Sequence, residues 1–151
     1  MKNYYIGAGI GNGESFLTSF DAALLKAGMG NYNLVRVSSI LPPHCSLRDS
    51  ITLEQGQILN TAYAALTSDK LDDVISAAVG IGIPKNKDHI GVIMEYSGHC
   101  DKEYASAQVH NMIIESMGLR GYEIEDIKCL CVDVKSDGSG FVTVFAGVAM
   151  W

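Results

Sequence analysis

Two adjacent serines, Ser38 and Ser39, have the residue types and spacing for a reaction of the chain with itself. The hydroxyl of Ser39 directly follows the Ser38 carbonyl and could attack it, so that the chain cuts itself and makes its own cofactor. An apolar run precedes the pair and Pro42-Pro43 follows it. The alternative reading is therefore a strand that runs into a turn.

Two acidic residues in apolar surroundings are further candidates. Asp21 falls in a predicted helix, where its carboxylate either faces solvent or binds a cation such as guanidinium in a two-pronged way. Glu95 comes near the end of a strongly apolar strand. Burial there would raise its pKa and suit it to act as an acid near neutral pH, whereas an edge position would leave it facing water.

Histidine and cysteine residues do not form a metal-binding pattern. The His-Cys dipeptides at 44–45 and 99–100 are irregularly spaced and have no close third ligand, so we predict no metal. Cys129 and Cys131 would point the same way from one strand, at a spacing that fits no zinc framework. We interpret the four cysteines as buried or free thiols of a cytoplasmic protein.

Four glycines alternate from Gly7 to Gly13, and we predict that they form a flexible loop before the first helix. A strand, a Gly-x-Gly pattern and a helix begin the dinucleotide-binding fingerprint. The third glycine is missing, because Asn12 and Glu14 occupy its two possible positions. A mobile loop is the preferred interpretation, and a dinucleotide-binding oxidoreductase is the alternative.

The hydrophobic pattern predicts two long helices and six or seven strands. The predicted helices are Ser15–Ala27 and Lys102–Met117. The predicted strands are Tyr4–Ala8, Tyr32–Val37, Ile58–Thr67, Val74–Ile83, Ile90–Tyr96, Ile124–Val134 and Phe141–Met150, with the last two joined as a hairpin. This order predicts the α+β class, as an αββα-type sandwich of largely antiparallel or mixed sheets in a single domain, 1–151.

Composition narrows the possible partners. The 151 residues carry a net charge of −6, and only 19% of them are charged, which hints at surface buried between subunits. No basic patch is present, so nucleic acid and anionic membranes are poor candidates. No signal peptide is visible, and no apolar run approaches the roughly 20 residues of a membrane span. These observations also favour the cytoplasm.

Taken together, the motifs resemble the pyruvoyl-dependent arginine decarboxylases over nearly the whole chain. The resemblance rests on the segments 19–28, 30–43, 79–87, 93–96 and 145–151. Its most specific part is Ser-Ser-Ile-Leu-Pro-Pro joined to the upstream Asn-Leu-Val-Arg. The resemblance implies a proenzyme cut between Ser38 and Ser39 into a small chain, 1–38, and a large chain, 39–151.

The same resemblance implies the role of each site residue. Ser39 attacks the Ser38 carbonyl in an N-to-O acyl shift, and Asn33 supplies a donor for the oxyanion. Elimination and hydrolysis then leave a covalent pyruvoyl group at position 39. This group forms a Schiff base with L-arginine and acts as an electron sink, so that agmatine and CO2 are released. Glu95 matches the proton donor, and Asp21 matches the carboxylate that binds the guanidinium.

The resemblance also implies a homotrimer with each active site between two subunits. Residues 44–56 depart from the family pattern, so another basic amino acid remains an alternative substrate. A non-enzymatic alternative is an unprocessed trimer that binds a small cationic ligand.

Overall fold

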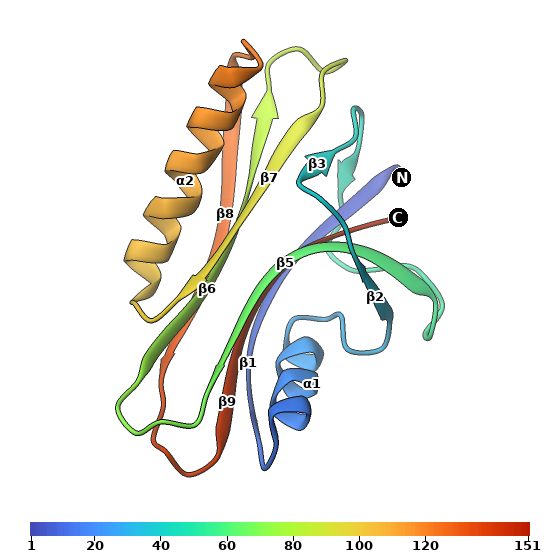
Figure 1. The fold of residues 1–151 in the computed structure, drawn as a ribbon. Helices are drawn as coiled ribbons and strands as arrows, with labels where there is room; N and C mark the ends of the chain where they lie inside the picture. Colours follow the sequence, from blue (N-terminus) through green and yellow to red (C-terminus); the bar gives the residue numbers. More distant parts are fainter.

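The computed structural model describes all 151 residues as two stacked β-sheets with one helix on each outer face (Figure 1). The first sheet has the strand order β2-β5-β9-β1-β4, and the second has the order β3-β7-β6-β8. Helix α1 (Phe16–Lys26) covers the first sheet and α2 (Lys102–Leu119) covers the second. The strands are β1 (Asn3–Gly13), β2 (Asn33–Arg36), β3 (Ile40–Leu41), β4 (Ser46–Leu47), β5 (Ile58–Ser68), β6 (Val74–Pro84), β7 (Gly91–Gly98), β8 (Ile124–Lys135) and β9 (Phe141–Met150).

This αββα arrangement confirms the predicted fold class. Most neighbouring strands are antiparallel, and the pairs β1–β4 and β2–β5 are parallel. All seven predicted strands are present, and two short strands, β3 and β4, lie outside the predicted ones. Neither helix has the length and apolar character needed to cross a membrane.

The largest apolar cluster fills the space between the sheets. Ile75, Val79 and Ile93 reach it from the second sheet, and Val144 and Val148 reach it from the first. Alternate positions along each strand face this core, as the two-residue period of a strand requires. Two smaller clusters lie beneath the helices. The two sheets therefore share one core, and each helix seals an outer face.

The alternating glycines form part of a strand, so the predicted flexible loop is wrong. β1 runs through all four glycines and pairs with β9 along its length. Glycine is needed because α1 lies directly against this strand. A β-carbon at Gly7, Gly9 or Gly11 would lie only 2.2–2.3 Å from backbone atoms of α1 or of its C-cap. The strand-to-helix loop of a dinucleotide site is absent, which removes that alternative.

The predicted hairpin of the last two strands is also wrong. β8 pairs with β6 in the second sheet, whereas β9 pairs with β1 and β5 in the first. Residues 136–140 therefore cross from one sheet to the other. The reason lies in burial: β9 occupies the centre of the first sheet with Val142–Met150 all buried, whereas no residue of the edge strand β8 is fully buried.

Candidate active site

The peptide between Ser38 and Ser39 lies where the chain crosses from the first sheet to the second (Figure 1). β2 forms the edge of the first sheet and β3 the neighbouring edge of the second. On the first sheet, the Val37 N–H donates to the Thr61 carbonyl at 3.2 Å. On the second sheet, the Ser39 carbonyl accepts from the Ile93 N–H at 2.8 Å. The serine pair is therefore anchored on both sides.

A three-residue turn centres on Ser39. The Ser38 carbonyl accepts a hydrogen bond from the Ile40 N–H at 3.0 Å, which closes the turn. Ser39 is half-buried, and neither its N–H nor its hydroxyl takes part in a hydrogen bond within the chain. A polarised carbonyl thus stands next to an uncommitted hydroxyl, the combination that a self-attack requires.

Glu95 lies on the same strand as the residue that anchors Ser39. It follows Ile93 by two positions on β7, so both side chains face the inner side of the second sheet. The Glu95 side chain is 20% exposed, and its Oε2 is buried without a hydrogen-bond partner. Burial raises the pKa of Glu95, and the nearby Arg36 guanidinium opposes that rise. A carboxyl with a raised pKa keeps its proton to a higher pH than an ordinary one, which suits it to act as an acid.

Asp21 lies on α1 and is not joined to the serine pair within one chain. Its side chain is exposed and forms no ion pair or hydrogen bond. α1 packs on the outer face of the first sheet, whereas Glu95 faces the space between the sheets. The carboxylate of Asp21 is therefore open to a ligand or to another subunit.

Asn33 begins β2, at the end away from the serine pair. Its side-chain amide donates to the Gly56 carbonyl at 2.6 Å. Within one chain, the group that donates to the Ser38 carbonyl is the Ile40 N–H. The role of Asn33 as an oxyanion donor stays a prediction. The Ile40 donor is a backbone group, so no residue type in the sequence could have revealed it.

Arg36 also belongs to the candidate site, although the sequence analysis assigned no role to it. It closes β2, two residues before Ser38, and its guanidinium Nη2 lies 3.8 Å from Glu95 Oε1. The available signal was a single arginine at the end of the strand that leads into the serine pair. That signal shows a positive charge near the cut but not which carboxylate it faces.

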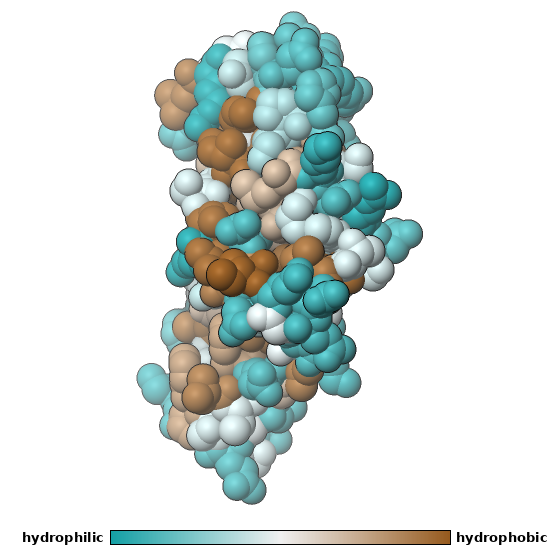
Figure 2. Space-filling model, turned by 90° about the vertical axis from the view of Figure 1, so that its right-hand side faces the viewer, coloured by the Kyte–Doolittle hydropathy of each residue, from teal (hydrophilic) through white to brown (hydrophobic).

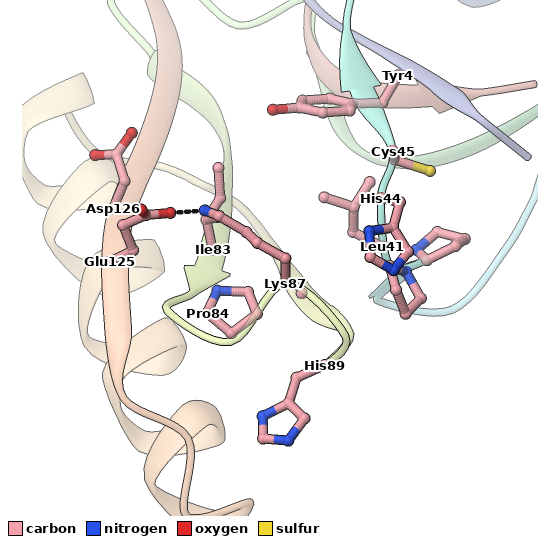
Figure 3. A pocket seen from close by; sticks show the side chains of 13 residues that line it. Tyr4, Leu41, His44, Cys45, Ile83, Pro84, Lys87, His89, Glu125 and Asp126 are labelled. Carbon is pink, nitrogen blue, oxygen red and sulfur yellow. Dashed lines mark hydrogen bonds and ion pairs between the residues drawn. The ribbon is translucent and has the colours of Figure 1, made fainter.

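The His-Cys dipeptides lie apart from this site. His44 and Cys45 line a cavity of about 480 Å³ beside β3 (Figure 3), and none of the candidate active-site residues lines it. His44 pairs with Asp88 at 3.2 Å, and His99 pairs with Asp73 at 2.8 Å. No three His, Cys, Asp or Glu side chains gather closely enough to hold a metal ion.

The rest of the segment 44–56 packs on the side of the molecule that carries α1. Ile51 and Leu53 contact the apolar cluster beneath that helix. The Trp151 indole N–H donates to the Thr52 hydroxyl at 3.1 Å. This segment therefore shares a layer with the helix of Asp21, and any contribution to substrate choice would come from that side.

Comparisons with known proteins match this chain along nearly its whole length. The family model for pyruvoyl-dependent arginine decarboxylase matches residues 3–147. The protein of that name from Methanocaldococcus jannaschii is 40% identical over 144 residues, which cover 95% of this chain and 86% of that protein. The Thermococcus kodakarensis protein of the same name is 41% identical over 134 residues, which cover 88% of this chain and 85% of that protein. The Pyrococcus abyssi protein of that name is 39% identical over 129 residues, which cover 84% of this chain and 81% of that protein.

Proposed function

Because this chain belongs to the pyruvoyl-dependent arginine decarboxylase family, we propose that it converts L-arginine to agmatine and carbon dioxide. We further propose that it cuts itself between Ser38 and Ser39 and that position 39 becomes the pyruvoyl group. The observation that carries the proposal is the local geometry at the cut. The Ser38 carbonyl is polarised by a hydrogen bond, and the Ser39 hydroxyl beside it is uncommitted.

In the proposed cut, Ser39 Oγ attacks the carbonyl carbon of Ser38, and the peptide C–N bond breaks as an ester forms. The Ile40 N–H donates to the oxygen on which negative charge develops. Elimination releases the Ser38 carboxylate as the end of the small chain and leaves dehydroalanine at position 39. Water converts that residue into the pyruvoyl group and releases ammonia. Asn33 is the proposed side-chain donor to the same oxygen, for which its amide must leave the Gly56 carbonyl.

The surroundings of position 39 fit a pyruvoyl group. Its formation removes the N–H and the hydroxyl of Ser39, and neither donates a hydrogen bond within the chain. The Ser39 carbonyl, which accepts from the Ile93 N–H, is kept. The groups that residue 39 loses in the conversion therefore take no hydrogen bond of the folded chain with them. A pyruvoyl group supplies a ketone that condenses with the substrate amine and takes up the electron pair left by carbon dioxide.

Two carboxyl groups complete the proposed site. Glu95 gives a proton to the substrate carbon after carbon dioxide has left, which suits a half-buried carboxyl whose pKa is raised. Asp21 binds the substrate guanidinium, and its exposed carboxylate can accept two N–H donors at once. Since Asp21 lies outside the first sheet and Glu95, on the second sheet, faces the space between the sheets, we propose that Asp21 comes from a neighbouring subunit.

The surface supports the proposed homotrimer with sites between subunits. Apolar patches lie among polar ones on the face that carries α1, β2 and β4 (Figure 2). The large apolar side chains exposed on α1 and on β2 to β5 are Phe16, Leu17, Leu25, Val35, Ile40, Leu47 and Ile58. Apolar surface of this kind is typical of interaction sites. We also propose a cytoplasmic location, which fits four cysteines without a disulfide.

Denaturing mass spectrometry of the purified full chain, with assays of CO2 and agmatine, tests the proposal. We expect two chains, 1–38 and 39–151, the second lighter than a simple hydrolysis product by one ammonia. Ser39→Ala should remain one chain. An intact wild-type chain that persists after long incubation would contradict self-cleavage, and CO2 release from lysine or ornithine but not arginine would contradict the substrate. Intact protein that binds arginine without releasing CO2 would favour the non-enzymatic alternative.

A further inference from the structure

Arg36 makes three contacts that hold its guanidinium at the mouth of the inter-sheet space. Nη2 donates to the Tyr63 carbonyl at 3.0 Å. The guanidinium carbon lies 4.9 Å from the centre of the Tyr63 ring, which is a cation–π contact. The same Nη2 lies 3.8 Å from Glu95 Oε1. A planar guanidinium suits this arrangement, because its fork of donors can face a carbonyl and a carboxylate at once.

Arg36 is the charged group that faces Glu95. The strands packed beside β7 or against its inner face are β3, β5, β6 and β9, and none of them contains Asp, Glu, Lys, Arg or His. The phenol of Tyr63 points the other way, toward Phe145 beneath α1. α2 packs on the opposite face of β7. The negative charge of a carboxylate at position 95 is therefore compensated by one positive group, the Arg36 guanidinium.

We infer that Arg36 is a positioning residue for proton transfer, which directs the proton of Glu95 to Oε2 and compensates the carboxylate left after transfer. The inference rests on the proposed role of Glu95 as proton donor. A protonated oxygen cannot favourably face a guanidinium, so the acid proton belongs on Oε2, the buried oxygen without a partner. After Oε2 gives its proton to the substrate carbon, both oxygens share a charge that Arg36 faces at Oε1. Water then returns a proton to Oε2.

The ion pair of Arg36 and Glu95 also joins the two chains that the proposed cut would produce. Arg36 stays on the small chain and Glu95 on the large chain, so the proton donor depends on a residue that cleavage separates from it covalently. The small chain would thus contribute to turnover after it has supplied the carbonyl for cleavage. Arg36→Gln removes the charge, and Arg36→Lys keeps a charge without the planar fork.

The test compares Arg36→Gln and Arg36→Lys with Arg120→Gln, which removes an arginine that donates to the Ser116 carbonyl on α2. Turnover is measured per pyruvoyl group across pH, so that incomplete cleavage does not enter the result. For Arg36→Gln we expect kcat on the acid side of its alkaline limb to fall by up to about tenfold, because a weaker acid transfers its proton more slowly. The alkaline limb of kcat should move up by about one pH unit, since an opposite charge lowers a carboxyl pKa by about 1–3 units and this one is partly exposed. For Arg36→Lys, both kcat and the position of the alkaline limb should lie between those of wild type and Arg36→Gln. For Arg120→Gln, both should match wild type.

A carbon-13 titration of the Glu95 carboxyl in the uncleaved Ser39→Ala chain gives a readout independent of activity. We expect Arg36→Gln to raise the pKa of Glu95 in that background, with Glu95→Gln identifying the signal. An unchanged titration and an unchanged alkaline limb would overturn the inference. A higher KM with unchanged kcat would make Arg36 a substrate-binding residue instead, and loss of pyruvoyl content alone would place it in cleavage. Wild-type protein that carries the pyruvoyl group but releases no CO2 would refute the proposed function instead.

Discussion

Replacing Gly9 with alanine tests whether α1 rests directly on the backbone of β1. A β-carbon at position 9 would lie 2.3 Å from the Ala23 carbonyl oxygen and 2.8 Å from the Ala27 amide nitrogen. Ordinary contacts of a β-carbon begin near 3.4 Å. Because both atoms belong to the backbone, neither can rotate away, and the helix must move from the sheet by about 1 Å.

This displacement lowers stability because it opens contacts that are now fully closed. Ala23 and Ala27 are 0% and 1% exposed. A gap of up to about 1 Å removes roughly a quarter to a half of the dispersion energy of each contact. Overpacking costs about 1–3 kcal/mol, and we expect about 2–3 kcal/mol because backbone atoms are involved. For a chain of this length the Tm should fall by about 4–12 °C.

Thermal unfolding followed by circular dichroism, at one protein concentration for all variants, measures this effect. Gly118→Ala is the matched control, because position 118 lies in α2 with no atom within 4 Å of an added β-carbon. Alanine should stabilise that helix by about 0.5–1 kcal/mol and raise the Tm by about 1–4 °C. A Gly9→Ala protein whose Tm equals or exceeds that of wild type would refute the close packing of helix and strand.

Three further outcomes follow from the site and its surroundings. Glu95→Gln should still cut and form the pyruvoyl group, and its kcat should fall by about 10²–10⁴, as measured by CO2 release per pyruvoyl group. Asp21→Asn should raise the KM for arginine roughly 10- to 100-fold with cleavage unchanged in mass spectra, because one charge-assisted contact is lost. The Ser68 and His99 hydrogen bonds hold the pKa of Asp73 below its ordinary 3.8, so they stabilise the fold above that pH and the gain is lost as pH falls through the lowered pKa. Urea unfolding should therefore show Asp73→Asn about 1–2 kcal/mol less stable than wild type at pH 7 and nearly equal to it in strong acid.

The long elements could be predicted because their signals are local. Phe16, Phe20 and Leu24 recur at helical spacing after Ser15, and Ser15 caps α1 as its position suggests. The strand β1 could not be predicted in full, since glycine is depleted in strands and four alternating glycines resemble a loop. Only the helix packed against them explains their presence, and that contact is tertiary.

The sequence also did not reveal which strands β8 and β9 pair with. Residues 136–140 are small and polar, a composition that suits a hairpin turn and a crossing between sheets alike. The distinguishing signal was the continuous apolar run of β9, which is typical of a central strand covered on both faces. β8 mixes charged and apolar residues and has no fully buried position, as suits an edge strand.

Residue types suggest the chemistry of the candidate site, but strand pairing decides which backbone and side-chain groups lie close together. Ser39 and the strand that carries Glu95 are far apart in sequence, and β3 pairs with β7 so that the Ser39 carbonyl meets the Ile93 N–H. The face to which Glu95 points is set by the pairing of β7 with β6, and a shift of that register by one residue would turn Glu95 away from the inter-sheet space. The donor at the Ser38 carbonyl is a backbone N–H, and the orientation of Arg36 depends on Tyr63, so neither was visible in the sequence.

The place of the proposed cut explains how one molecule can gain a free chain end without losing its fold. β1 pairs with β9 from Tyr4 to Gly13, and β2 pairs with β5, so residues 1–38 remain part of the first sheet after the cut. Their loss would expose the core between the sheets, which makes dissociation unfavourable. Because the proposed cut falls between two anchors, position 39 would become a chain end that is still held by its carbonyl on β7. A reactive group at a chain end, fixed beside a carboxyl acid, is the arrangement that pyruvoyl chemistry requires.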